Sequence, residues 1–206
     1  MDALVLVDIQ NDFMPFGALP VPRGEEIVAV ANVLSPRFGT VIATQDWHPP
    51  GHASFASSHE GRMPGDVIEL GGVDQVLWAD HCVQQTAGAS FHSGLDISAI
   101  GHVVRKGSDA GVDSYSGFFD NDHRRATGME VLLRRLKVNR IVIAGLATDY
   151  CVMYTALDAR RLGFEVVVVR EGCRAVGLDP RDEGRSWERM RAAGCHVASV
   201  ADIVRT

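Results

Sequence analysis

The sequence predicts a single α/β domain whose doubly wound parallel sheet, of about six strands, carries helices on both faces. Short apolar runs rich in β-branched residues recur along the 206 residues, and stretches of helical periodicity separate them. The first run, residues 3–7, is apolar at every position, as is typical of a strand buried on both faces of a parallel sheet. Since no linker, repeat or low-complexity segment divides the chain, we expect one domain over residues 1–206.

Strands and helices alternate along the chain, which implies right-handed crossovers. Strands are expected in the apolar runs at 3–7, 40–44, 102–107, 141–144, 164–169 and 195–200. Helices are expected where apolar residues recur every three or four positions, at 25–38, 129–137, 152–162 and 180–193. Residues 53–90 are rich in Gly, Ser and Asp and are expected to form a long functional loop, with residues 201–206 as a short tail.

Composition excludes several classes of function. A formal net charge of −6 argues against general binding to nucleic acid or to anionic membranes. The four cysteines (82, 151, 173 and 195) are widely spaced and show no disulfide framework, and core packing is the default for all but Cys151. The apolar run at 3–7 is too short for a signal peptide or a membrane span, so a cytoplasmic location is expected. The sequence leaves the oligomeric state open, and a homo-oligomer is compatible with it.

Polar residues that could take part in catalysis lie at the ends of three predicted strands. Asp8 follows the first strand, Lys106 ends the strand at 102–107, and Cys151 follows the strand at 141–144. In a parallel sheet these ends meet at one edge, where open α/β sheets place their chemistry. Thr148 or Asp149 is expected to cap the helix that begins near Cys151, and the helix N-terminus would then favour a thiolate. The alternative is that Cys151 is simply packed in the core.

The strand at 40–44 leads into a second group of polar residues. Asp46, His48 and His52 lie within seven residues, and one carboxylate with two imidazoles suits zinc, iron or manganese. His59 and His81 are further imidazole candidates, between which the spacing does not decide. The first strand lacks the glycine-rich fingerprint that a nucleotide cofactor would require, so none is expected.

Taken together, these motifs resemble the nicotinamidases, also called pyrazinamidases, of the isochorismatase-like cysteine hydrolase family. The resemblance runs over nearly the whole chain and is carried by residues 7–13, 46–49, 52, 54–55, 81–84, 106–107, 113–118 and 145–152. It implies a Rossmann-like, isochorismatase-like fold and the hydrolysis of nicotinamide to nicotinic acid and ammonia in NAD salvage. Pyrazinamide, converted to pyrazinoic acid, is implied as a second substrate.

The resemblance also implies roles for individual positions. The implied catalytic triad is Asp8, Lys106 and Cys151. The implied oxyanion donors are the amides of Ala147 and Cys151, beside a cis peptide bond between Leu146 and Ala147. The implied metal ligands are Asp46, His48, His52 and His81, which selects His81 over His59, and the implied ion is zinc, with iron or manganese as alternatives. The implied substrate pocket comprises Phe13, Trp78, Tyr115 and Leu146.

Three other interpretations compete with this one. Another amidase of the family, such as an N-carbamoyl amide hydrolase, would keep Asp8, Lys106 and Cys151 but has no need of a ring-binding metal. A ligand-binding homologue without turnover would keep the fold alone, although the three triad residue types are intact here. A redox-sensing role for Cys151 is weakened because no resolving cysteine neighbours it in the sequence.

Overall fold

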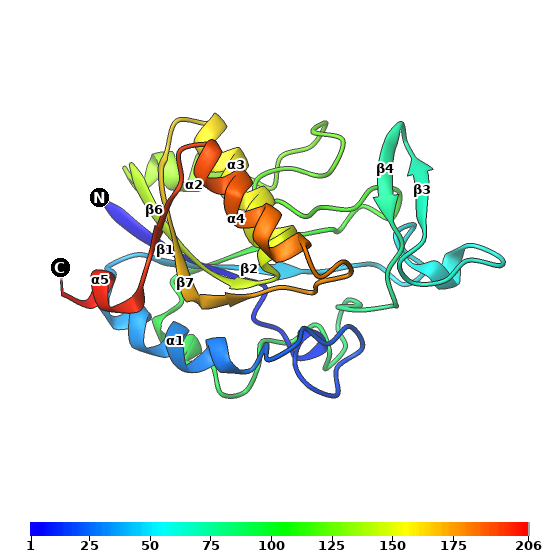
Figure 1. The fold of residues 1–206 in the computed structure, drawn as a ribbon, viewed down its shortest axis with the longest axis horizontal. Helices are drawn as coiled ribbons and strands as arrows, with labels where there is room; N and C mark the ends of the chain where they lie inside the picture. Colours follow the sequence, from blue (N-terminus) through cyan, green and yellow to red (C-terminus); the bar gives the residue numbers. More distant parts are fainter. Residues whose placement is uncertain (206) are drawn as a thin grey trace.

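The computed structural model describes residues 1–205 and shows a six-stranded parallel sheet between layers of helices (Figure 1). The strands of this sheet are β1 (Asp2–Val7), β2 (Val41–Asp46), β5 (His102–Lys106), β6 (Arg140–Leu146), β7 (Glu165–Arg174) and β8 (His196–Ala198). They lie in the order β5-β2-β1-β6-β7-β8, and every neighbouring pair is parallel. The predicted fold class is confirmed. Chain order reverses direction between β1 and β6, the point at which such sheets bind ligands.

Helices cover both faces of the sheet, as the sequence predicts. They are α1 (Glu26–Leu34), α2 (Met129–Arg135), α3 (Met153–Arg161), α4 (Asp182–Ala192) and α5 (Val200–Val204). Helices α1 and α5 lie on one face and α2, α3 and α4 on the other (Figure 1). None of the helices in residues 1–205 is long and apolar enough to cross a membrane.

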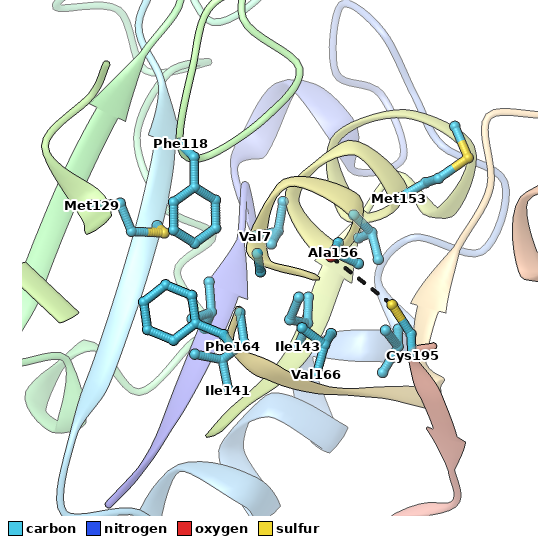
Figure 2. Close-up of a cluster of buried hydrophobic side chains, with 14 of the residues drawn as sticks. Val7, Phe118, Met129, Ile141, Ile143, Met153, Ala156, Phe164, Val166 and Cys195 are labelled. Atoms are coloured by element: carbon cyan, nitrogen blue, oxygen red, sulfur yellow. Dashed lines mark hydrogen bonds between the residues drawn. The ribbon is translucent and has the colours of Figure 1, made fainter. Parts of the chain in front are cut away.

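The alternation of side chains along β1 divides the core into two halves. Val5 and Val7 pack with α2, α3 and α4, whereas Leu4 and Leu6 pack with α1 on the opposite face. Figure 2 shows part of the first half, in which Phe118 and Met129 lie near Phe164, and Ala156 of α3 lies near Cys195. Each fully buried large apolar side chain contributes about 1.5–3 kcal/mol, so both halves stabilise the sheet that carries the site.

The cysteines other than Cys151 belong to this packed interior. Cys82, Cys173 and Cys195 are all buried and free. The Cys195 Sγ lies 3.9 Å from the carbonyl oxygen of Ala156 in the core drawn in Figure 2. Core packing therefore accounts for these three side chains.

Several predicted boundaries are wrong. Residues 53–90 are not all loop, because β3 (Val67–Leu70) and β4 (Val73–Val76) form an antiparallel hairpin. The expected tail at 201–206 is largely the helix α5, whose start carries a capping box between Ser199 and Asp202. Thr206 itself lies outside the described residues. The helix expected over 25–38 ends at Leu34, and a 3₁₀ turn that contains Pro36 follows.

Gly145 permits the close approach of β6 to β1 beside the site. Its φ is +142°, and a Cβ there would lie 2.1 Å from the carbonyl oxygen of Val7. Gly145→Ala is therefore expected to lower the free energy of unfolding by about 3 kcal/mol, through overpacking and backbone strain. Urea denaturation would measure this. Gly39→Ala is the control, since its Cβ would meet nothing within 4 Å; equal stabilities of the two variants would contradict the argument.

Candidate active site

The carboxyl edge of the sheet brings the three predicted catalytic side chains together. Asp8 directly follows β1, Lys106 is the last residue of β5, and Cys151 lies beyond the end of β6. The Lys106 Nζ lies 2.9 Å from the Asp8 Oδ2 and donates a hydrogen bond of 3.3 Å to the Cys151 Sγ. Because β2 separates β5 from β1, the long lysine side chain reaches across the intervening strand.

Lys106 is a buried cation surrounded by acceptors. Only 2% of the residue is exposed. Besides its contacts with Asp8 and Cys151, its ammonium donates to the Asp46 Oδ1 at 3.0 Å and to the Ser114 carbonyl at 2.8 Å. Burial disfavours the charged form, but the carboxylates of Asp46 and Asp8 outweigh it and raise the pKa of Lys106 well above its usual value. Lys106 is therefore a fixed positive charge beside the thiol.

Burial and the predicted effect of the helix start act in opposite directions on the pKa of the Cys151 thiol. Burial raises the pKa of Cys151 well above its usual value and outweighs the opposing effect of Lys106. Burial also raises the pKa of Asp8, although Lys106 opposes this. Attack by sulfur therefore requires a base to remove the proton, and Asp8 is the carboxyl group in place to act as one.

The turn that carries Cys151 differs from the expected helix start. Thr148–Val152 form a π-helical turn ahead of α3, and Ala147 occupies the N-cap position without a side-chain hydrogen bond. The predicted cap by Thr148 or Asp149 is therefore wrong. The Asp149 carboxylate instead accepts hydrogen bonds from the amides of Val176 and Gly177 at 3.0 and 2.8 Å, which ties the turn to the segment after β7.

A group with the chemistry of a metal site lies next to Lys106. Ligand atoms of Asp46, His48 and His81 all lie within 4.8 Å of one another. The Nδ1 atoms of His48 and His81 bond to the carbonyls of Gly107 and Ala79 at 2.9 and 2.8 Å, which leaves each Nε2 as the ligand atom. The buried His48 Nε2 lies 3.1 Å from the Asp46 Oδ2 but makes no hydrogen bond of good geometry with the described residues. These residues fit a divalent transition metal ion.

The two other histidines considered as ligands, His52 and His59, are placed differently. His52 is buried beside His48, with ring centroids 4.4 Å apart, but its nitrogens lie outside the group formed by Asp46, His48 and His81. Its Nδ1 bonds to the Ser54 hydroxyl at 2.8 Å, and its buried Nε2 has no hydrogen-bond partner among residues 1–205. The His59 Nε2 bonds to the carbonyl of Ala53 at 2.8 Å, so the structure also favours His81 over His59.

A largely apolar cavity connects the metal-site residues to Cys151. It is lined by Phe13, Leu19, Asp46, Trp78, His81, Asp113, Tyr115, Ala147, Tyr150, Cys151 and Val176. The structure thus brings the predicted pocket residues Phe13, Trp78 and Tyr115 together. Leu146 does not reach this lining and is buried in the core half that contains α1.

The loop after β6 has the backbone geometry that the resemblance implies. The peptide bond between Leu146 and Ala147 is cis. Ala147 and Cys151, whose amides are the implied oxyanion donors, both line the cavity. The carbonyl of Ala147 accepts hydrogen bonds from the amides of Tyr150 and Val152, which closes the turn around Cys151.

Several residues of the site have no predicted role. Tyr150 meets Trp78 edge to face, with ring centroids 4.7 Å apart, and forms a wall of the cavity. The Gln10 side chain clamps the backbone of Asp46, accepting from its amide and donating to its carbonyl, both at 2.8 Å. The Asp113 Oδ1 lies 3.8 Å from the His48 Nε2. All three fall inside the motifs that resemble the family, which is the signal that could have singled them out.

Known proteins resemble this chain over nearly its full length. A family model described as the isochorismatase domain matches residues 2–202. The nicotinamidase of Escherichia coli K12 is 47% identical, over 99% of this chain and 97% of the relative. A solved nicotinamidase and pyrazinamidase from Acinetobacter baumanii has a TM-score of 0.96 at 40% identity. The match covers 98% of this chain and 97% of the solved chain.

A third similarity bears on the metal site. The pyrazinamidase of Pyrococcus horikoshii, solved in complex with zinc, is 37% identical with a TM-score of 0.78, over 96% of this chain and 98% of the other. The matching family model covers nearly all of the chain. The chain therefore belongs to the isochorismatase family.

Proposed function

We propose that this protein is a nicotinamidase that hydrolyses nicotinamide to nicotinic acid and ammonia and also accepts pyrazinamide. The observation that carries the proposal is the arrangement within one cavity. The Lys106 ammonium contacts Asp8, Cys151 and Asp46, and Cys151 lines one cavity together with Asp46 and His81 of the group that fits a metal. The nicotinamidases of similar sequence and structure support the choice of substrate.

The residues of this chain divide the reaction between them. Asp8 takes the proton of the Cys151 thiol as the sulfur attacks the carboxamide carbon, and the Ala147 and Cys151 amides stabilise the oxyanion, each donor contributing roughly 3 kcal/mol. Asp8 then passes this proton to the leaving amine, since an amide anion is too basic to leave. Asp8 finally activates the water that hydrolyses the thioester. Lys106 stabilises the developing thiolate throughout.

Asp46 and His81 of the metal-site group line the cavity in which the pyridine ring would sit. Asp46, His48 and His81 would hold the ion, with His52 beside them, and zinc is proposed first, with iron or manganese as alternatives. When bound, the ion supplies a Lewis acid for the ring nitrogen and so orients the substrate. Phe13, Trp78 and Tyr115 enclose the ring.

The same geometry weighs against the alternatives. An N-carbamoyl amide hydrolase needs no ring-binding metal, so the Asp46, His48 and His81 group favours a pyridine carboxamide. A ligand-binding homologue without turnover has no need of a buried lysine between an acid and a thiol. We further propose a place in NAD salvage in the cytoplasm, with no nucleic acid or membrane partner and with a homo-oligomer compatible with the fold.

The test is ammonia release from nicotinamide by the purified, metal-loaded protein, measured before and after treatment with a chelator. Ammonia is expected from the loaded protein, with activity lost on chelation and restored by added zinc. Mass spectrometry of the intact protein would measure the bound metal before and after chelation. Absence of ammonia from the metal-loaded protein would overturn the proposal, and N-carbamoyl amides would be assayed next.

A further inference from the structure

The two carboxyl oxygens of Asp8 have different partners. Thr44, on β2, is completely buried, and its hydroxyl donates a hydrogen bond of 2.6 Å to the Asp8 Oδ1. The same hydroxyl oxygen accepts a hydrogen bond of 3.2 Å from the Asp8 amide. Thr44 thus contacts both the backbone and the side chain of Asp8, at a residue whose φ is +49°.

The second oxygen faces the reacting groups. The Asp8 Oδ2 lies 2.9 Å from the Lys106 Nζ, which in turn bonds to the Cys151 Sγ. This oxygen is buried and has no hydrogen-bond partner of good geometry within residues 1–205. One oxygen is therefore held by Thr44, and the other is ion-paired with Lys106, the residue that also contacts the Cys151 thiol.

We propose that Thr44 is a positioning residue that fixes the rotation of the Asp8 carboxyl group, so that Oδ2 receives the proton from Cys151 and returns it to the leaving amine. The final torsion of an aspartate has a broad, two-fold energy profile, so a carboxyl group without such a partner rotates between orientations. The threonine is itself stiff about χ1, because its Cβ is branched. The proposal rests on the proposed function of Asp8 as the base.

The methyl group of Thr44 has a separate role in packing. A Cβ built at Gly117 would lie 3.0 Å from the Thr44 Cγ2, so this methyl packs against the loop that follows β5. A residue that acts only by packing would be replaced well by valine and poorly by serine. A residue that acts through its hydroxyl would show the opposite order.

The experiment compares Thr44→Val with Thr44→Ser in the metal-loaded protein. Thr44→Val is expected to lower kcat for nicotinamide by about 10- to 100-fold with KM changed by no more than about threefold, because ring binding does not involve the carboxyl orientation. Thr44→Ser is expected to keep kcat within about threefold of the wild type. Equal losses in both variants, or a larger loss in Thr44→Ser, would overturn the proposal.

A second measurement is independent of the substrate. Alkylation of Cys151 by iodoacetamide, followed by peptide mass spectrometry, also requires removal of the thiol proton, and it is expected to slow about tenfold in Thr44→Val but not in Thr44→Ser. If the wild type releases no ammonia, the proposed function fails while this comparison still decides the role of Thr44. Should Thr44→Val not fold, Thr44→Ala against Thr44→Ser isolates the same hydroxyl, and equal alkylation rates there would contradict the inference.

Discussion

Replacing Cys151 with alanine is expected to lower kcat for nicotinamide by about 10⁴-fold or more, because no other group can form the thioester. The substitution removes one sulfur atom from the cavity and leaves Lys106, Asp8 and the metal-site residues in place. Nicotinic acid is therefore expected to bind with an affinity within about threefold of that of the wild type. Ammonia release and isothermal titration calorimetry would measure the two quantities.

Cys195→Ala is the matched control for this prediction. Cys195 is also buried, but its Sγ packs against the Ala156 carbonyl in the core rather than lining the cavity. Its loss is expected to leave kcat unchanged. Turnover by Cys151→Ala above about 1% of the wild-type rate would point to a different nucleophile.

Replacing Lys106 with methionine is expected to lower the free energy of unfolding by about 3–5 kcal/mol and to abolish turnover. The variant would leave the buried carboxylates of Asp8 and Asp46 without their shared cation. Lys106 also opposes the effect of burial on the pKa of Asp8, so this pKa should rise further in the variant. A carboxyl group whose pKa is raised in the folded state contributes less to the free energy of unfolding as the pH rises. The loss of stability in the variant should therefore be larger at pH 8 than at pH 5.

Urea denaturation of both proteins in the presence of chelator would measure this deficit without a contribution from metal release. Lys137→Met is the control, because Lys137 is the only other lysine in the sequence and is exposed. Its effect is expected to stay within about 0.5 kcal/mol. Similar losses in the two variants, or a deficit independent of pH, would show that the buried charge cluster does not stabilise the fold.

Much of the site can be predicted because the ends of the strands can be located from the sequence. Apolar runs locate β1, β5 and β6, and a parallel sheet then places Asp8, Lys106 and Cys151 at one edge. The contact between Thr44 and Asp8 is not predictable in this way, since it depends on the rotamers of two side chains from neighbouring strands. The effect of burial on Cys151 is not predictable either, because packing, rather than any motif, raises the pKa of this thiol.

The segment between β2 and β5 is the part of the chain whose structure is hardest to predict from the sequence. Its histidines lie in irregular loops without periodicity, so spacing alone leaves His59 and His81 equivalent. The hairpin of β3 and β4 did leave a signal, because the paired residues Leu70 and Val73 flank a Gly71-Gly72 turn. Its strands are short and half exposed, which weakens the apolar pattern that marks a strand.

The segments that build the cavity span most of the chain. They run from Phe13, beyond β1, to Val176, beyond β7, and Asp149 joins the nucleophile turn to the last of these. A nascent chain that ends before residue 176 would lack Val176, which lines the cavity, and β8, an edge strand of the sheet. The cavity can therefore be complete, and the protein active, only late in synthesis. Activity requires nearly the whole fold, since these contacts join residues far apart in sequence.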